Sequence, residues 1–378
     1  MPQIILILLL CICTLATSNT LRVGFVTDIH IGEKCNGILI KEKCPPMQDI
    51  AAAFAKMNTL NLDAVFLSGD LTSSALLEEF YTLRELLGEL NVPWWPLLGN
   101  HDAWPYTSHD DGTFNQTDTP IGDAYFAQVF GDVLSSNVAD ERLAKLYINS
   151  STKNWPSQEC HNGYYNTFDS WFHNYDVIFP NFSQDFHFLS LDFVARGAAL
   201  PEPGVGPEVE LHDFECGTLD WLTKQLDLIK NEQANSKFFI VQHHPFHNRA
   251  ALDPFGNNYV FNFTFDDNQD KTVQKVLSAY FPPSAFLGVH SGHNHRWFNG
   301  SAFTLKTCLT NEWLSIPEWE TPATKGWWLD EAYVSSMTIF TFEADDDGKN
   351  AKLSNAEGFW RTPPLFEWIS KPAVSNKL

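Results

Sequence analysis

Basic residues are scarce in this 378-residue sequence, and their scarcity argues against one class of partner. The chain contains 24 Lys and Arg residues against 46 Asp and Glu residues, so its formal net charge is −22 at pH 7. A polyanion repels such a chain unless Lys and Arg gather in a local patch, and the sequence contains no such patch. We therefore expect no nucleic-acid partner.

Long apolar runs are also absent, except at the N-terminus. There an apolar run, Ile4–Leu15, precedes the small residues Ala16-Thr17-Ser18. The run is too short to cross a bilayer comfortably, which takes about 20 apolar residues. We therefore interpret residues 1–18 as a secretory signal peptide cleaved after Ser18, with a membrane anchor as the alternative. The mature chain is expected to have no stable membrane anchor, and to be secreted or to reside in the lumen of the secretory or lysosomal pathway.

Cysteines are few, and their spacing is not that of a zinc ribbon. Removal of the signal would leave an odd number of them, so at most two internal disulfides can form in an oxidising compartment. Cys35 and Cys44 are the pair that we predict to be bonded. They flank a short loop that follows Asp28 and His30, two residues of the metal-ligand type, and a disulfide there would hold these residues in place. Sequons for N-glycosylation fit the same compartment, and they occur at Asn115, Asn149, Asn181, Asn262 and Asn299.

What the chain does have is enough apolar sequence for one large domain, which we expect over residues 19–378. Hydrophobic residues make up 44% and aromatic residues 14% of the composition, which is ample for a sizeable core. Up to residue 100, apolar strands alternate with amphipathic helices, which predicts crossover units of a parallel sheet. The predicted strands are Leu21–Thr27, Ala64–Leu67 and Val92–Leu98, and the predicted helices are Met47–Leu60 and Leu76–Leu90.

The regular pattern stops at about residue 103 and returns at about residue 185. This stretch is rich in Asp, Asn and aromatic residues, and we expect an irregular insertion there. Its rings either cover a substrate or merely pack the insertion together, and packing is the favoured reading; examples are Trp104, Tyr106, Trp155, Tyr164 and Trp171. Beyond it we predict the strands Phe186–Leu191, Phe238–Val241, Phe286–Val289, Phe303–Cys308 and Ser335–Phe342, and the helices Leu219–Ile229 and Lys271–Tyr280.

Five short segments share one construction, in which an apolar strand-like run ends in side chains of the metal-ligand type. A single histidine in such a place is more often a packed core residue, but five segments in series are not explained that way. Mixed oxygen and nitrogen ligands favour a catalytic pair of Zn, Mn or Fe ions over a structural zinc. Glycine before three of the ligands lets the backbone turn off a strand and approach the ions closely. The segments are Asp28-Ile29-His30, Gly69-Asp70, Gly99-Asn100-His101-Asp102, His243-His244-Pro245 and Gly292-His293-Asn294-His295.

This series, over residues 21–300, resembles the calcineurin-like metallophosphoesterases. The resemblance implies an α/β fold, a four-layer αββα sandwich with a site for two divalent or trivalent metal ions on its rim. It leaves His101 for catalysis, and it favours His243 over its neighbour His244 as a ligand because a proline follows one residue later. By this resemblance one ion is held by Asp28, His30 and His295, the other by Asn100, His243 and His293, and both by Asp70.

Two features of the sequence indicate which branch of the superfamily it resembles most. Ser73 stands where the protein Ser/Thr phosphatases have Asp and where purple acid phosphatases have a metal-binding Tyr. The cysteine-bearing loop and the run Ala103-Trp104-Pro105 are more similar to the secreted acid-sphingomyelinase-like phosphodiesterases. The chain is therefore expected to hydrolyse a small-molecule or lipid phosphate ester, either a monoester or a diester.

The expected mechanism is attack on phosphorus by a hydroxide that bridges the two ions. His101 would protonate the leaving alkoxide, and Asp102 would either orient His101 or serve the structure. The alternative function is a non-catalytic secreted metal-binding or interaction protein on the same fold. Such a protein would be expected to have lost a ligand or His101, and the sequence retains all of them.

Overall fold

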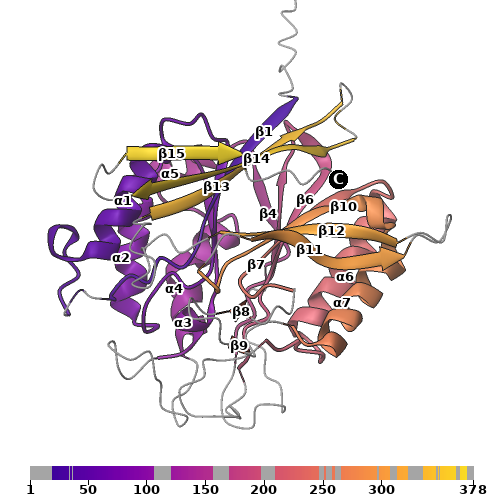
Figure 1. The fold of residues 1–378 in the computed structure, drawn as a ribbon, viewed down its shortest axis with the longest axis horizontal. Coiled ribbons are helices and arrows are strands. Elements are labelled where there is room, and N and C mark those ends of the chain that lie inside the picture. The colour runs from indigo at the N-terminus through magenta and orange to yellow at the C-terminus, as the bar shows by residue number, and fades with distance from the viewer. Residues whose placement is uncertain are drawn as a thin grey trace, which may run out of the picture.

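Two β-sheets packed face to face form the centre of the computed structural model (Figure 1). The first sheet consists, in spatial order, of β15 (Glu367–Pro372), β14 (Lys352–Thr362), β13 (Ser335–Glu343), β1 (Thr20–Val26), β2 (Ala64–Ser68) and β3 (Trp94–Leu97). The second consists of β11 (Phe298–Lys306), β12 (Trp313–Glu320), β10 (Phe286–Ser291), β7 (Lys237–Gln242), β6 (Ser183–Leu191), β5 (Tyr175–Phe179) and β4 (Ser151–Lys153). A separate pair is formed by β8 (Ala251–Leu252) and β9 (Asn258–Tyr259).

The residues that the structure describes cover most of the chain. They are 19–33, 35, 37–105, 121–155, 170–196, 209–246, 251–252, 258–259, 265–295, 298–306, 313–321, 335–345, 348, 350–362 and 367–372. Within these ranges, no helix has the length and apolar character needed to cross a membrane. The proposed signal peptide, Tyr106, Tyr164, Asn115 and Asn262 lie outside them.

Helices cover the outer faces of both sheets, so that four layers result (Figure 1). The αββα sandwich predicted from the sequence is confirmed. The first sheet is covered by α1 (Pro45–Met57), α2 (Leu77–Leu87) and α4 (Gly122–Leu134), and the second by α6 (Thr218–Glu232) and α7 (Asp267–Tyr280). Short helical turns fill connections: η1 (Lys41–Lys43), α3 (Asn100–Ala103), α5 (Glu141–Leu146) and η2 (Pro283–Ala285).

The ends and faces of these helices follow from their sequences. α1 starts with two prolines, which have no N–H to leave unsatisfied in the first turn, and it buries Ile50, Phe54 and Met57 at helical spacing. α7 starts after Asp266, whose side chain accepts hydrogen bonds from the backbone N–H groups of Asn268 and Gln269. Each helix is thereby fixed with its apolar face toward a sheet.

The insertion predicted over about 103–185 is mostly regular in its described parts. It contains α4, α5, β4 and β5, and it contributes two strands to the second sheet. In α4, Phe126, Phe130 and Val133 are buried with helical spacing. Polar and aromatic residues around this stripe obscure the period in the sequence, which is why the helix was not expected.

Successive side chains of the central strands of the second sheet belong alternately to two hydrophobic cores, one on each face of the sheet. Phe188 of β6 and Phe239 of β7 belong to the core between the sheets. Their neighbours Leu189, Phe238 and Ile240 belong to the core under α6 and α7. Since side chains of a strand point alternately to its two faces, the middle of the sheet is buried on both sides, and β7 has the unbroken apolar run Phe238–Val241.

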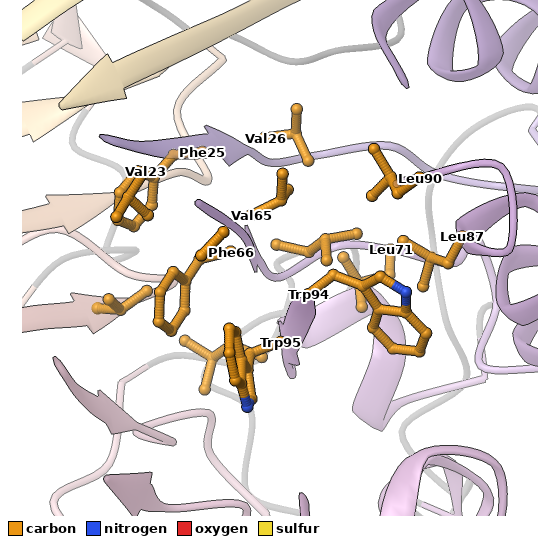
Figure 2. Close-up of a cluster of buried hydrophobic side chains, with 14 of the residues drawn as sticks. Val23, Phe25, Val26, Val65, Phe66, Leu71, Leu87, Leu90, Trp94 and Trp95 are labelled. Atoms are coloured by element: carbon orange, nitrogen blue, oxygen red, sulfur yellow. The ribbon is translucent and has the colours of Figure 1, made fainter. Parts of the chain in front are cut away.

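Aromatic rings fill the space between the two sheets. Phe66 of β2 stacks on Phe25 and Trp95 of its own sheet, with ring centroids 5.4 Å away in both cases, and on Phe188 of the second sheet at 5.0 Å. Figure 2 shows Phe25 and Phe66 on one side of the strands and Leu87 on the other, where α2 lies. Phe66 therefore contacts both sheets two residues before the end of β2.

The first prediction concerns this ring. Phe66→Ala should lower the free energy of unfolding by about 3–5 kcal/mol, because a fully buried ring is removed from a packed core and a cavity is left. Urea unfolding measures the change. Leu228→Ala, at an α6 position that is 50% exposed, is the control and should change the free energy by less than about 0.5 kcal/mol. An equal effect of both substitutions would contradict this account of the core.

The predicted disulfide is confirmed. Cys35 and Cys44 are bonded, with their Cα atoms 4.4 Å apart, and both are buried. Cys216 is disulfide-bonded as well. The loop that follows Asp28 and His30 is therefore closed covalently at its base.

Candidate metal centre

The five ligand segments converge at one rim of the sandwich. Asp28 and His30 follow β1, Asp70 follows β2, and Asn100 starts α3 directly after β3. From the second sheet come His243 after β7, and His293 and His295 after β10. Carboxyl ends of parallel strands meet at the same edge of a sheet, and the two sheets present these edges to each other.

Four of the predicted ligands form a first group. The ligand atoms of Asp28, His30, Asp70 and His295 all lie within 4.8 Å of one another. His295 Nε2 is 2.9 Å from Asp28 Oδ1, and His30 Nε2 is 3.6 Å from Asp70 Oδ2. This is the set that the sequence assigned to one ion, including the carboxylate expected to bridge.

A second group surrounds the Nε2 atom of His243. This nitrogen lies 3.1 Å from Asn100 Oδ1, 3.1 Å from His293 Nδ1 and 3.3 Å from Asp70 Oδ1. Asp70 therefore turns one oxygen toward each group. The structure thus brings every predicted ligand to the rim, in the two sets expected.

His243 and His244 both lie beside His293, so the choice between them depends on hydrogen bonding. His243 Nδ1 is 2.8 Å from the carbonyl oxygen of Ser68. A nitrogen that donates to a carbonyl keeps its proton, so Nε2 is the nitrogen that can lose its proton and bind an ion. His244 is buried with its ring centroid 4.4 Å from that of His293, and its nitrogen belongs to the same geometric group. The fixed tautomer favours His243 as the ligand.

Much of this ligand set has a left-handed backbone, which is uncommon for residues other than glycine. Neighbouring backbone groups hold it, because the N–H of Asp28 donates to Gly69 O and the N–H of His30 donates to Asp70 O, both at 3.0 Å. The first ligand loop is therefore tied to the second. The residues with positive φ are Asp28 (53°), His30 (48°), Asp70 (49°), His293 (72°) and His295 (54°).

Three glycines permit this close packing. A Cβ atom on Gly69 would lie 2.5 Å from His243 Nδ1. On Gly99 it would collide with the backbone of Asp70, and on Gly292 with the side chain of Thr27. The glycines before Asp70, Asn100 and His293 therefore let the ligand segments approach one another, and the close approach to the ions that we inferred for them stays a prediction.

The electrostatics of the centre depend on the pairing of Asp70 with imidazoles. Burial opposes the charge of Asp70, but His243, His101 and His30 outweigh it and hold the pKa of this carboxyl well below its usual range. Burial likewise opposes the charge of His243, but Asp70 raises the pKa of that imidazole to about 9. In the protein without ions, Asp70 and His243 therefore form a buried ion pair.

The residues present fit a cation at this place. His243 Nε2 lies close to Asn100 Oδ1, His293 Nδ1 and Asp70 Oδ1 at once, and a protonated Nε2 has one hydrogen for these three neighbours, whereas a cation can be shared by all of the ligand atoms. Oxygen and imidazole donors of this kind suit Zn, Mn and Fe ions. The donor set, its burial and its convergence are thus those of a metal centre.

His101 lies beside the first group, with its ring centroid 4.4 Å from that of His30. Its backbone N–H donates to Asp70 Oδ1 at 2.9 Å, and its ring Nδ1 is 2.9 Å from the carbonyl oxygen of Ser73. Nδ1–H therefore donates to this carbonyl, which directs Nε2 elsewhere. The orienting partner is a backbone atom, which no side-chain motif in the sequence could reveal.

Asp102 is fully buried and holds two loops together. Its carboxylate accepts hydrogen bonds from the backbone N–H groups of Leu71, Thr72 and Gly99, at 2.7–3.0 Å, and from the Thr72 hydroxyl. Burial and the charge of Asp70 raise the pKa of Asp102 to about 7 despite these donors. Of the two roles that the sequence left open, these contacts favour the structural one.

The second prediction tests that role. Asp102→Asn replaces one acceptor oxygen by an NH₂ group that faces backbone N–H donors, so the free energy of unfolding should fall by about 1–3 kcal/mol. Urea unfolding with and without added metal ions measures it. Unchanged unfolding combined with a loss of hydrolysis would show instead that Asp102 acts through His101.

The aromatic residues of the insertion pack against protein where they are described. Trp104 is fully buried, and its indole N–H donates to the carbonyl oxygen of Ala195 at 2.9 Å. Trp155 and Trp171 are half-buried and stack on each other at 5.8 Å. Packing, the favoured reading of these rings, accounts for Trp104 completely.

A model of the calcineurin-like phosphoesterase family matches residues 21–296, a stretch that contains every residue of the centre. The chain belongs to the calcineurin-like phosphoesterases. The family resemblance inferred from the five segments is thereby confirmed, and so is the hydrolytic class that it implies. No curated protein is similar enough in sequence to be counted as a relative.

Solved structures with a related arrangement are distant from this calcineurin-like phosphoesterase. A dimetal phosphatase from Danio rerio is 12% identical with a TM-score of 0.44, over 94% of this chain and 99% of the other. A purple acid phosphatase from yellow lupin is 13% identical with a TM-score of 0.44, over 94% of this chain and 54% of the other. A phosphopantetheinyl hydrolase from Mycobacterium tuberculosis is 10% identical with a TM-score of 0.35, over 79% and 87%.

Proposed function

We propose that the protein is a secreted phosphoesterase that depends on two metal ions and hydrolyses phosphomonoester or phosphodiester bonds. The observation that carries this proposal is the position of Asp70, with one carboxylate oxygen beside His243 and the other beside His30. Two ligand groups that share one carboxylate are the arrangement of a two-ion site. Family membership supports hydrolysis of a phosphoester, and the activity and its substrate belong to the proposal.

The ligand roles in the proposal are those that the resemblance assigned. When bound, the two ions would lower the pKa of a water molecule and neutralise charge on the phosphoryl oxygens. The protein's part is to hold the ligand atoms in place and to exclude bulk water from them. One ion would be held by Asp28, His30 and His295, the other by Asn100, His243 and His293, with Asp70 shared.

His101 is the proposed general acid. With Nδ1 donating to Ser73 O, the protonated ring carries its second hydrogen on Nε2, and this is the hydrogen that would pass to the leaving alkoxide. Its position beside both Asp70 and His30 supports this role, because a phosphate bound to the ions would lie next to His101 without a need for His101 to bind an ion. A contribution of about 10²–10⁴ in rate is typical for such a group.

Secretion is part of the proposal and is supported by two observations. The Cys35–Cys44 disulfide persists in an oxidising compartment, and the sequon residues Asn149 and Asn181 are exposed. The disulfide closes the loop on which the similarity to acid-sphingomyelinase-like phosphodiesterases partly rests, so we keep that branch as the proposed nearest one. A non-catalytic binding protein is the weaker candidate, since the ligand set and His101 are complete.

The substrate class is tested with the purified protein and four esters. Hydrolysis of p-nitrophenyl phosphate, bis-p-nitrophenyl phosphate, ATP and sphingomyelin should be compared at saturating metal. A phosphodiesterase of the proposed branch should prefer the diester and sphingomyelin. No hydrolysis of any ester by metal-loaded protein would favour the binding protein instead.

The third prediction concerns the shared carboxylate. Asp70→Asn should lower the occupancy of both ion sites and abolish turnover, because the amide has only one oxygen and no charge to share between two cations. Metal analysis and hydrolysis of bis-p-nitrophenyl phosphate are the measurements. Asp227→Asn, the same change at an exposed position of α6, is the control and should keep both properties. Full metal content with parental activity in Asp70→Asn would refute the shared role.

The fourth prediction separates acid catalysis from metal binding. His101→Ala should retain two ions but hydrolyse an alkyl phosphate ester about 10²–10⁴-fold more slowly, with a smaller loss on a p-nitrophenyl ester whose leaving group needs no proton. Ser73→Ala keeps the carbonyl that orients His101 and is the matched control. Equal losses on both esters would remove His101 as the acid, and loss of an ion would make it a ligand.

A further inference from the structure

Thr27 directly follows β1 and directly precedes Asp28, and its side chain is completely buried. Its hydroxyl oxygen is 2.7 Å from Asp28 Oδ2, 3.2 Å from Ser68 O and 3.5 Å from Gly69 O. A hydroxyl has one hydrogen, and a bond to a charged acceptor is shorter and stronger than one to a neutral carbonyl. The distances therefore indicate that the Thr27 hydroxyl donates its hydrogen bond to the carboxylate of Asp28.

The two oxygens of Asp28 consequently have different surroundings. Oδ2 receives the Thr27 O–H, and the backbone N–H of His293 is shared between Oδ2 at 3.0 Å and Oδ1 at 3.2 Å. Oδ1 is 2.9 Å from His295 Nε2, inside the first ligand group. The Thr27 hydroxyl thus holds Oδ2, and Oδ1 is the oxygen that faces the other ligands of the first group.

The two hydrogen-bond donors to Oδ2 come from different sheets. Thr27 directly follows β1, and His293 follows β10. Gly292, just before His293, packs directly on the Thr27 side chain, so that a Cβ atom there would collide with the hydroxyl and come within 2.7 Å of Asp28 Oδ2. The threonine is therefore enclosed, and the rotation of the Asp28 carboxylate is determined where the sheets meet.

We propose that Thr27 is a positioning residue of the metal centre, whose hydroxyl fixes the Asp28 carboxylate so that Oδ1 faces the ion held with His30 and His295. This inference rests on the proposed two-ion site. It assigns to Thr27 its main effect on that ion, because the contacts of Asn100 and His243 do not pass through Asp28, and the Asp28 carboxylate meets His293 at its backbone N–H and not at a ligand atom.

The test uses two substitutions at Thr27, of which one removes the hydroxyl and the other keeps it. Thr27→Val has nearly the same shape as threonine and no hydroxyl, whereas Thr27→Ser keeps the hydroxyl and loses a methyl group. Full-length metal-free protein is titrated with Zn²⁺ against a chromophoric chelator, and circular dichroism checks that each variant is folded. Hydrogen-bond partners of metal ligands typically contribute 10–100-fold in metal affinity, which sets the expected size of the effect.

The expected result is that the parent binds two Zn²⁺ ions, and that Thr27→Val binds one of them with parental affinity and the other about 10–100-fold more weakly. Thr27→Ser should bind both as the parent does. Two parental affinities in folded Thr27→Val would overturn the inference and leave the proposed function intact. Equal weakening in both variants would also overturn it, since shape and not the hydroxyl would then matter. A parent protein that binds no Zn²⁺ would overturn the inference and the two-ion proposal together.

Discussion

The centre depends on the close approach of two sheets at the carboxyl ends of their strands. Asp70 lies at this meeting point, with one oxygen beside His243 of the second sheet and the other beside His30 of the first. Neither group of ligands is complete within one sheet. Because Phe66 stacks on Phe188 across the interface and lies in β2 only four residues before Asp70, core packing and ligand geometry are parts of the same contact.

The two sheets can approach this closely because glycines, which have no side chain, lie where the ligand loops meet. Hydrogen bonds to backbone atoms maintain the approach. Gly69, Gly99 and Gly292 each leave room for an atom of a neighbouring ligand segment. The carboxylate of Asp102 joins the loop after β2 to the loop after β3 through backbone N–H groups. Left-handed backbone at the ligands costs free energy, and the packed sheets on either side supply the constraint that keeps it.

Sequence reasoning identified the parts of the site whose signal is chemical. The pattern of apolar runs that end in Asp, Asn and His located every residue that the structure brings to the rim, and the positions of Cys35 and Cys44 predicted their bond. Roles that depend on geometry were not accessible. The Ser73 carbonyl beside His101 has no sequence signature, and Thr27 before Asp28 resembles any polar residue at a strand end.

The central claim is that hydrolysis requires two ions in the site around Asp70. Its most direct test is metal analysis of the purified protein, followed by removal of the ions with a chelator and stepwise return of Zn²⁺ or Mn²⁺ during hydrolysis of bis-p-nitrophenyl phosphate. The account predicts two ions per chain, no hydrolysis after their removal, and full recovery only when the second ion has been returned. Hydrolysis by metal-free protein, or full recovery with one ion, would contradict it.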